Sequence, residues 1–177
     1  MARRVPVFSY GSNLCIDRML LRTPGAQVTC VGFVEGYDLR FHKAGVDGSA
    51  KADCFQTDDA SDRVWGAVYE ISPRAKSRLD RYESLGVGYF EKQIEVYSGD
   101  GQGVVRAWVY VANPAQIDPG MQPYSWYHRF VVVGARQHGI EPDYRRRLDA
   151  VTTMEDPDRH RHRRQWDIIK QEVPRNE

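Results

Sequence analysis

Six short segments rich in β-branched and aromatic residues constrain the fold of this chain more than any other feature. They recur through the first two thirds of the sequence: Val5 to Tyr10, Val28 to Glu35, Tyr37 to His42, Val64 to Ile71, Phe90 to Tyr97 and Val104 to Val111. Residues 98–103, Ser-Gly-Asp-Gly-Gln-Gly, join the last two as a glycine-rich turn typical of an antiparallel hairpin. This spacing favours a small closed or nearly closed β-barrel.

Helices are expected between and after these strands. Ser72 followed by Pro73 is a strong helix start, because serine caps the first turn and proline fits its first position, and this helix is predicted to run to about Glu83. A second helix is predicted from Tyr124 to His138, and Pro142 opens a third. The sequence therefore predicts an α+β fold, a mixed β-barrel flanked by helices.

Length and composition predict one soluble domain. A chain of 177 residues with 41% hydrophobic residues can bury a real core, so residues 1–177 are expected to form a single domain, with 151–177 as a C-terminal extension. Its 25 basic and 24 acidic residues give a charge of +1, which argues against nucleic acid or anionic membrane as a partner. No apolar stretch approaches the ~20 residues that span a bilayer, so a cytoplasmic location is expected.

The cysteines suggest neither a disulfide framework nor a zinc site. Cys15, Cys30 and Cys54 are odd in number and lack CxxC spacing, so each is expected to be a small buried side chain. A catalytic Cys–His pair, formed by Cys15 or Cys54 with His42 or His128, is an alternative that no local pattern supports.

Two other segments carry weaker signals. Residues 112–123 hold three prolines and a glycine, and this stretch is predicted to be either an ordered crossing loop or a mobile cover. The basic run 158–164 is interpreted as a solvated surface segment, with phosphate contact as the next reading. Metal binding by His160 and His162 is poorer still, because flanking arginines repel a cation, and no metal is expected.

The tetrapeptide Tyr10-Gly11-Ser12-Asn13 follows the first predicted strand and is the best candidate for a binding loop. Glycine allows unusual backbone angles, and consecutive exposed N–H groups in such a turn form an anion-binding nest. A carboxylate or a developing oxyanion would fit there. A turn that closes the strand without any function would have the same local sequence.

Glu83 is the best candidate for a general base. It lies where the helix from Ser72 ends, and because the C-terminal end of a helix is negative, its proton affinity is expected to rise. The alternative is a solvent-exposed glutamate at a frayed helix end. The sequence contains no P-loop, no GxGxxG after a strand, no GxSxG and no HExxH, so a cofactor-free chemistry is predicted.

Taken together, these motifs resemble the γ-glutamylcyclotransferases over roughly residues 5 to 150. The matching pieces are Tyr10-Gly11-Ser12-Asn13-Leu14, Val64 to Tyr69 (Val-Trp-Gly-Ala-Val-Tyr), Leu79 to Glu83 (Leu-Asp-Arg-Tyr-Glu), Gly88-Tyr89, Pro123 with Tyr127, Gly134 to Ile140 (Gly-Ala-Arg-Gln-His-Gly-Ile), and Pro142 with Tyr144 and Leu148. The resemblance implies the same small mixed β-barrel flanked by helices. Ser84 is a departure, because the family often has glycine directly after the catalytic glutamate.

The resemblance also implies an activity of the acyl-transfer or lyase type that needs no cofactor. The α-amine of a γ-glutamyl amino acid attacks its own γ-carbonyl, which forms 5-oxoproline and releases the amino acid, with Glu83 as general acid and base. Asp80 and Glu91 are the next candidates for that role. The implied substrate-binding residues are Tyr10, Gly11, Ser12, Asn13, Leu14, Cys15, Tyr89 and Tyr127.

Several alternatives remain open on the sequence. The substrate could instead be a γ-glutamyl amine or a γ-glutamylated natural-product intermediate, selected by the loop 112–123, or glutathione. A domain that binds a small ligand without turning it over is the non-enzymatic alternative. Nucleic-acid binding through residues 159–164 lacks a wider basic face. A homodimer is compatible with the sequence.

Overall fold

Five strands close into a small barrel in the computed structural model, which describes residues 4–169. The barrel strands are β1 (Val5–Ser9), β2 (Gln27–Glu35), β5 (Arg63–Ile71), β6 (Tyr89–Ser98) and β7 (Val104–Ala112). Their order is β1-β5-β2-β6-β7, and all neighbours are antiparallel except β1 and β7, which close the barrel in parallel. The predicted α+β fold with a mixed barrel is confirmed.

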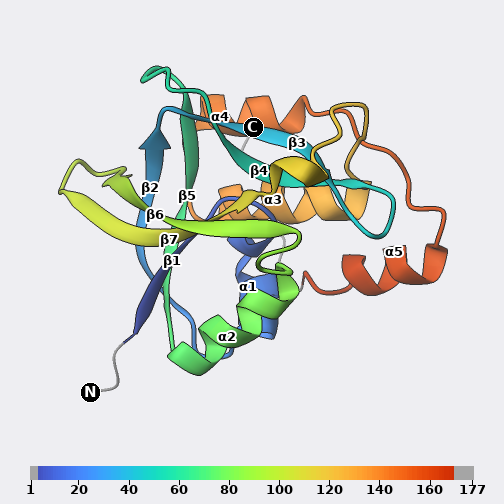
Figure 1. Ribbon diagram of the computed structural model, residues 1–177, viewed down its shortest axis with the longest axis horizontal. Helices are drawn as coiled ribbons and strands as arrows, with labels where there is room; N and C mark the ends of the chain where they lie inside the picture. The colour runs from blue at the N-terminus through green and yellow to red at the C-terminus, as the bar shows by residue number, and fades with distance from the viewer. Residues whose placement is uncertain (1–3, 170–177) are drawn as a thin grey trace.

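A two-stranded hairpin extends from the barrel and was only half predicted. It pairs β3 (Tyr37–Ala44) with β4 (Ala50–Gln56), and Figure 1 shows it between the barrel and the helix α5. The sequence of β4, Ala-Lys-Ala-Asp-Cys-Phe-Gln, is poor in strand-forming residues. Its strand conformation comes from pairing with β3, which local propensity does not reveal.

Five α-helices surround the strands within the described residues. They are α1 (Ile16–Arg22), α2 (Pro73–Tyr82), α3 (Ser125–Gln137), α4 (Pro142–Asp149) and α5 (Arg159–Trp166), with short 3-10 turns η1 (Ser12–Leu14) and η2 (Pro114–Gln116). The expected α2, α3 and α4 are confirmed, and the Ser72 hydroxyl caps α2 by accepting a hydrogen bond from the Ala75 N–H. None of the helices between residues 4 and 169 is long and apolar enough to cross a membrane.

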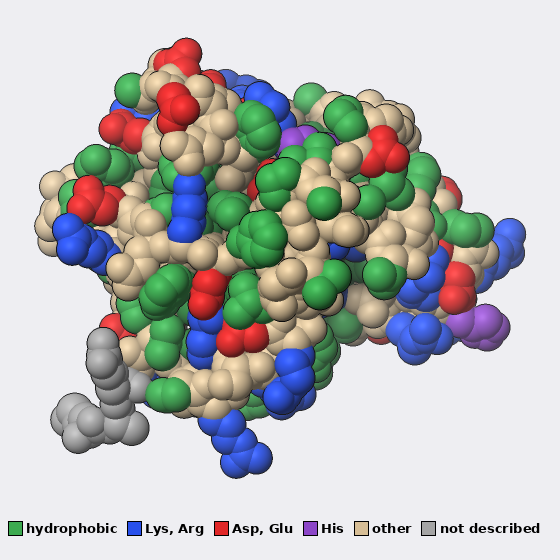
Figure 2. All heavy atoms as spheres, viewed as in Figure 1, with side chains coloured by type: hydrophobic (Ala, Val, Ile, Leu, Met, Phe, Trp, Pro, Cys, Tyr) green, Lys and Arg blue, Asp and Glu red, His purple; other side chains and the backbone are tan. Residues whose placement is uncertain are grey.

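The basic run forms α5, a surface helix that the sequence did not predict. Asp158 caps this helix by accepting a hydrogen bond from the Arg161 N–H. The side chains of residues 159, 160, 163 and 164 are exposed, as expected, but Arg161 docks against the rest of the protein. On the face of the molecule in Figure 2, basic and acidic side chains are interspersed, in keeping with the small net charge.

The helix α3 is the buried element that positions the loop after β1. A Cβ at Gly134 would lie only 2.5 Å from the Cys15 backbone nitrogen, so glycine is what lets α3 approach η1 this closely. Phe130 and Val131 of α3 are fully buried on either side of this contact. All three cysteines are free and buried, as predicted.

The segment 112–123 is an ordered crossing loop. The Asn113 N–H donates to the Gly88 carbonyl, the Asp118 N–H donates to the His42 carbonyl, and Ile117 forms an isolated bridge with Lys43 of β3. These backbone bonds tie the loop to the turn after α2 and to the end of β3.

Candidate active site

One small cavity gathers most of the residues that the sequence singled out. It lies where the loop after β1 faces the end of α2 and the hairpin strand β4. Its lining residues are Phe8, Ser9, Tyr10, Gly11, Ser12, Asn13, Ala52, Glu83, Tyr89, Tyr110 and Tyr127. Leu14 and Cys15 are fully buried outside this lining, where they pack in the core.

The loop after β1 presents free backbone donors to the cavity. Within residues 4–169, the N–H groups of Gly11, Ser12 and Asn13 have no hydrogen-bond acceptor in the protein, whereas the next N–H, from Leu14, bonds back to the Gly11 carbonyl at 2.9 Å. Consecutive unbonded N–H groups of this kind bind anions. Arg18 holds the loop from behind, because its Nε donates to the Ser12 hydroxyl at 3.1 Å.

The carboxylate of Glu83 is held at the cavity wall by two donors. Glu83 follows the last residue of α2, and its side chain is 14% exposed, so the alternative of a solvated glutamate is wrong. Its Oε1 accepts hydrogen bonds from Asn13 Nδ2 at 2.8 Å and from Arg22 Nη1 at 3.1 Å. Arg22 Nη1 also donates to Asn13 Oδ1 at 2.8 Å, so the three side chains fix one another.

The turn after Glu83 is tight, with serine directly after the glutamate. Ser84 adopts a left-handed conformation with φ of 49°. Its carbonyl accepts hydrogen bonds from the N–H groups of Val87 at 2.9 Å and Gly88 at 2.7 Å. This tight turn brings Tyr89 back to the cavity.

Two tyrosine hydroxyls bracket the backbone of Ala52. The Ala52 N–H donates to the Tyr127 hydroxyl oxygen at 3.0 Å, and the Tyr89 hydroxyl donates to the Ala52 carbonyl at 2.8 Å. Burial raises the pKa of both tyrosines, so both are neutral donors at physiological pH. Since the Tyr127 oxygen accepts the Ala52 N–H, its own hydroxyl proton can be donated to the neighbouring Ser12 side chain or to a ligand.

Asp80 and Glu91, the other candidate bases, lie behind the cavity. Both bind the ammonium of Lys76, Glu91 at 2.6 Å. The Tyr110 hydroxyl, which the sequence analysis did not single out, donates to Asp80 Oδ1 at 2.6 Å, and Tyr10 donates to the Tyr110 carbonyl at 2.6 Å. The cavity therefore meets Tyr110 and not the carboxylates of Asp80 or Glu91.

The alternative of a Cys–His pair finds no support in this geometry. Among the described residues neither Cys15 nor Cys54 bonds to a histidine, and burial raises the pKa of both thiols. His42 instead pairs with Asp53 at 2.9 Å, and His128 Nε2 lies 2.8 Å from the Leu148 carbonyl oxygen.

Comparisons with known proteins find one group of similar sequences. A sequence model of the AIG2-like family matches residues 63–148. A γ-glutamylcyclotransferase from Mus musculus is 29% identical over 154 residues, which cover 84% of this chain and 79% of the mouse protein, and its counterpart from Homo sapiens is 27% identical over 150 residues, covering 81% and 77%. The chain is thus similar to the AIG2-like family and to the γ-glutamylcyclotransferases of mouse and human.

Two solved structures superpose on most of this chain. An uncharacterized protein from Homo sapiens, loc79017, superposes with a TM-score of 0.76 at 25% identity, covering 85% of this chain and 89% of that one. A structure named gamma-glutamyl cyclotransferase superposes with a TM-score of 0.77 at 23% identity, covering 86% and 90%, and this likeness concerns the fold. The barrel and helices of this chain are thus shared with those structures.

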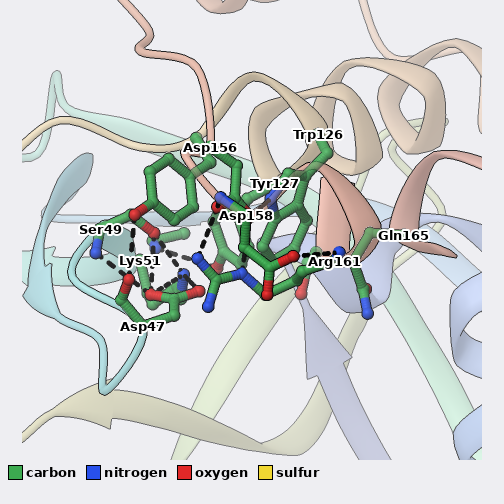
Figure 3. A network of polar contacts seen from close by, with 12 residues as sticks. Asp47, Ser49, Lys51, Trp126, Tyr127, Asp156, Asp158, Arg161 and Gln165 are labelled. Carbon is green, nitrogen blue, oxygen red and sulfur yellow. Dashed lines mark hydrogen bonds and ion pairs between the residues drawn. The ribbon is translucent and has the colours of Figure 1, made fainter. Parts of the chain in front are cut away.

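Lys51 lies next to the Tyr127 ring, and its ammonium is surrounded by polar and aromatic side chains (Figure 3). Lys51 Nζ donates to both carboxylate oxygens of Asp47, at 2.7 and 2.9 Å, and to the Ser49 hydroxyl at 2.6 Å. It also lies 4.8 Å from the Tyr127 ring centroid and 5.2 Å from that of Trp126. Burial lowers the pKa of Lys51 to about 8 against the opposing effect of Asp47.

A neighbouring set of hydrogen bonds connects α5 to α3. Asp156, whose side chain is fully buried, accepts hydrogen bonds from Trp126 Nε1 at 2.8 Å and from two nitrogens of Arg161 at 2.6 and 2.5 Å (Figure 3). Arg161 holds the pKa of Asp156 low, at about 2. Arg18, which bonds to Ser12 in the loop after β1, donates to Gln165 of α5 at 2.7 Å. The basic helix is therefore connected to the wall of the cavity.

Proposed function

We propose that this chain is a γ-glutamylcyclotransferase that converts a γ-glutamyl amino acid to 5-oxoproline and a free amino acid. The observation that carries the proposal is the convergence of Glu83, the Tyr127 hydroxyl and the free N–H groups of residues 11–13 on one cavity. The names of its relatives from mouse and human support the same activity.

The proposed reaction is an internal acyl transfer within the substrate. The substrate's α-amine attacks its γ-carbonyl, a C–N bond closes the five-membered ring, and the bond to the leaving amine breaks. Since nucleophile and electrophile belong to one molecule, the protein needs no nucleophile of its own, and holding the reactive conformer can contribute ~7 kcal/mol or more. A cavity lined by fixed tyrosines and a short loop suits that task.

Glu83 moves the proton in this proposal. The α-ammonium loses two protons in becoming the lactam N–H, one before the amine attacks and one as the ring closes, and the departing nitrogen gains two and leaves as an ammonium. The Glu83 carboxylate accepts these protons one at a time and passes each on to the departing nitrogen, so no net proton is consumed. The bonds from Asn13 and Arg22 to Oε1 orient this carboxylate and leave Oε2 without an acceptor role in the interactions of the described residues. Oε2 is thus the oxygen we assign to the transfer.

In this proposal, residues 11–13 and Tyr127 stabilise the negative charge on the substrate. The free N–H groups of Gly11, Ser12 and Asn13 are placed to bind the substrate's α-carboxylate or the oxygen of its γ-carbonyl. Tyr127 offers a neutral hydroxyl proton to the same region. Donors fixed in place before the reaction stabilise a developing oxyanion without reorganisation.

Detection of 5-oxoproline by mass spectrometry tests the proposal. Purified protein is given γ-glutamyl dipeptides, γ-glutamyl amines and glutathione, and Glu83→Gln is compared with Glu91→Gln, which alters a carboxylate behind the cavity. We expect product with wild type and Glu91→Gln, and a loss of at least about 100-fold in Glu83→Gln. Normal turnover in Glu83→Gln contradicts the role of Glu83. If no substrate yields 5-oxoproline, the proposed activity is contradicted and the alternative of a ligand-binding domain is favoured.

A further inference from the structure

Lys43 is a buried lysine whose ammonium has no anionic partner in the described part of the chain. The residue lies near the end of β3 and is 8% exposed. Within residues 4–169 its Nζ makes no hydrogen bond or ion pair, whereas the partly buried Lys51 binds Asp47 and the partly buried Lys76 binds Asp80 and Glu91. Because burying an unpaired ammonium is unfavourable, such a group is expected to serve a ligand.

The ammonium of Lys43 lies beside the cavity, next to Glu83. Its Nζ is 5.1 Å from the centroid of the Tyr89 ring, which lines the cavity. It is also 3.2 Å from the point where a Cβ on Gly88 would stand, and the Glu83 carbonyl oxygen is 3.1 Å from that same point. Gly88 therefore leaves the room that the ammonium occupies at the end of α2.

The backbone of Lys43 is fixed on both sides. It pairs with Lys51 across the hairpin and bridges to Ile117 in the crossing loop. Burial lowers the pKa of Lys43, and the nearby carboxylates of Glu83 and Asp47 oppose that effect. The amine is thus held at a defined place by the backbone contacts of Lys43 on both sides.

The other cations around the cavity are already engaged. Arg18 bonds to Ser12 and to a glutamine of α5, Arg22 bonds to Glu83 and Asn13, and Lys51 bonds to Asp47. Of these four side chains, Lys43 is the one left to bind an incoming anion.

We propose that Lys43 binds the carboxylate of the leaving amino acid and so makes this chain select γ-glutamyl amino acids over γ-glutamyl amines. This inference rests on the proposed cyclotransferase function. The substrate carries two carboxylates; the N–H groups of residues 11–13 can hold the first, and the second lies two bonds from the nitrogen that Glu83 protonates. Lys43 is adjacent to Glu83, where that second carboxylate would arrive.

A matched pair of substrates tests this role. γ-Glutamylalanine and γ-glutamylethylamide differ by the single carboxylate that Lys43 is proposed to bind. We measure kcat/KM for each with wild type, Lys43→Met and Lys43→Arg, and we use Lys92→Met as a control because Lys92 lies on β6, bonded to Gln56, outside the cavity lining. The readout is the ratio of kcat/KM between the two substrates.

Wild type is expected to prefer γ-glutamylalanine, and Lys43→Met is expected to lower the ratio by about 10- to 100-fold, chiefly through KM. Lys43→Arg keeps the charge and is expected to retain most of the preference, and Lys92→Met is expected to leave the ratio unchanged. An unchanged ratio in Lys43→Met, including an equal loss on both substrates, overturns the inference but not the cyclotransferase. Absence of 5-oxoproline with wild type overturns both.

Discussion

Asn13 donates a hydrogen bond of 2.8 Å to Glu83, which joins the loop after β1 to the end of α2. The bond links the part of the cavity that we assign to anion binding with the carboxylate that we assign to proton transfer. Arg22 closes the arrangement by bonding to both residues. Hydrogen bonds therefore couple the proposed base to the proposed binding loop, and a change in one side chain should alter the orientation of the other.

Replacing Asn13 by alanine should lower kcat without unfolding the protein. Glu83 would keep only its bond to Arg22, and a carboxylate displaced by about 1 Å can slow proton transfer by roughly 100-fold. We expect kcat for 5-oxoproline formation to fall by about 10- to 100-fold. Asn113→Ala is the matched control, because that asparagine caps η2 away from the cavity lining. A normal kcat in Asn13→Ala would show that Arg22 alone suffices to orient Glu83.

Tyr127 and Tyr89 form a natural pair for separating catalysis from packing. Each hydroxyl bonds to Ala52, so replacement of either by phenylalanine leaves one buried backbone group unsatisfied and should cost about 1–3 kcal/mol of stability. The Tyr89 hydroxyl donates its proton to Ala52, whereas the Tyr127 oxygen accepts from Ala52 and can still donate its proton to Ser12 or to a ligand. We therefore expect kcat to fall by about 10-fold or more in Tyr127→Phe and by much less in Tyr89→Phe. Equal effects of the two variants on kcat would argue against Tyr127 as a donor to substrate.

Ser84→Gly should stabilise the protein. Ser84 has a φ of 49°, a conformation that costs a residue with a Cβ about 1 kcal/mol or more and costs glycine little. Its side chain is exposed, so little packing is lost. We expect the free energy of unfolding in urea to rise by about 0.5–1 kcal/mol, whereas Ser84→Ala, which keeps the Cβ, gains nothing. A loss of stability in Ser84→Gly would mean that greater freedom of the unfolded chain outweighs the relief of strain.

The sequence predicted those parts of the fold that have local signals. The strands of the barrel follow from β-branched and aromatic runs, and α2 follows from its Ser72-Pro73 start. The strand β4 was missed because its conformation depends on pairing with β3, and α5 was missed because a run of arginine and histidine has no apolar face. Both elements are created by tertiary contacts.

The candidate site could be predicted only in part, for a similar reason. Tyr10 to Asn13, Glu83, Tyr89 and Tyr127 lie in recognisable motifs and meet at the cavity. Arg22 and Tyr110 lie in no motif, and only the packing of α1 and β7 brings them there. Leu14 and Cys15 belong to the same motif as the binding loop, but η1 turns their side chains into the core.

The stability of this protein should depend on pH through Lys51. Burial lowers the pKa of Lys51 to about 8, whereas an unfolded lysine titrates near 10.4. Between these values the unfolded chain binds the proton that the folded protein releases, so the free energy of unfolding rises with pH through this window. The cost of burying the ammonium is fully present below pH 8 and is relieved above it.

Comparison with Lys51→Met isolates this effect, because the variant lacks the titrating group. From pH 7 to pH 9.5 the stability of wild type should gain about 2 kcal/mol relative to Lys51→Met, measured by urea denaturation. The buried tyrosines are common to both proteins, so their titration cancels in the difference, and Lys92→Met serves as a control with a surface lysine. A difference that stays constant over this range would mean that Asp47 and Ser49 keep Lys51 protonated as fully as water does.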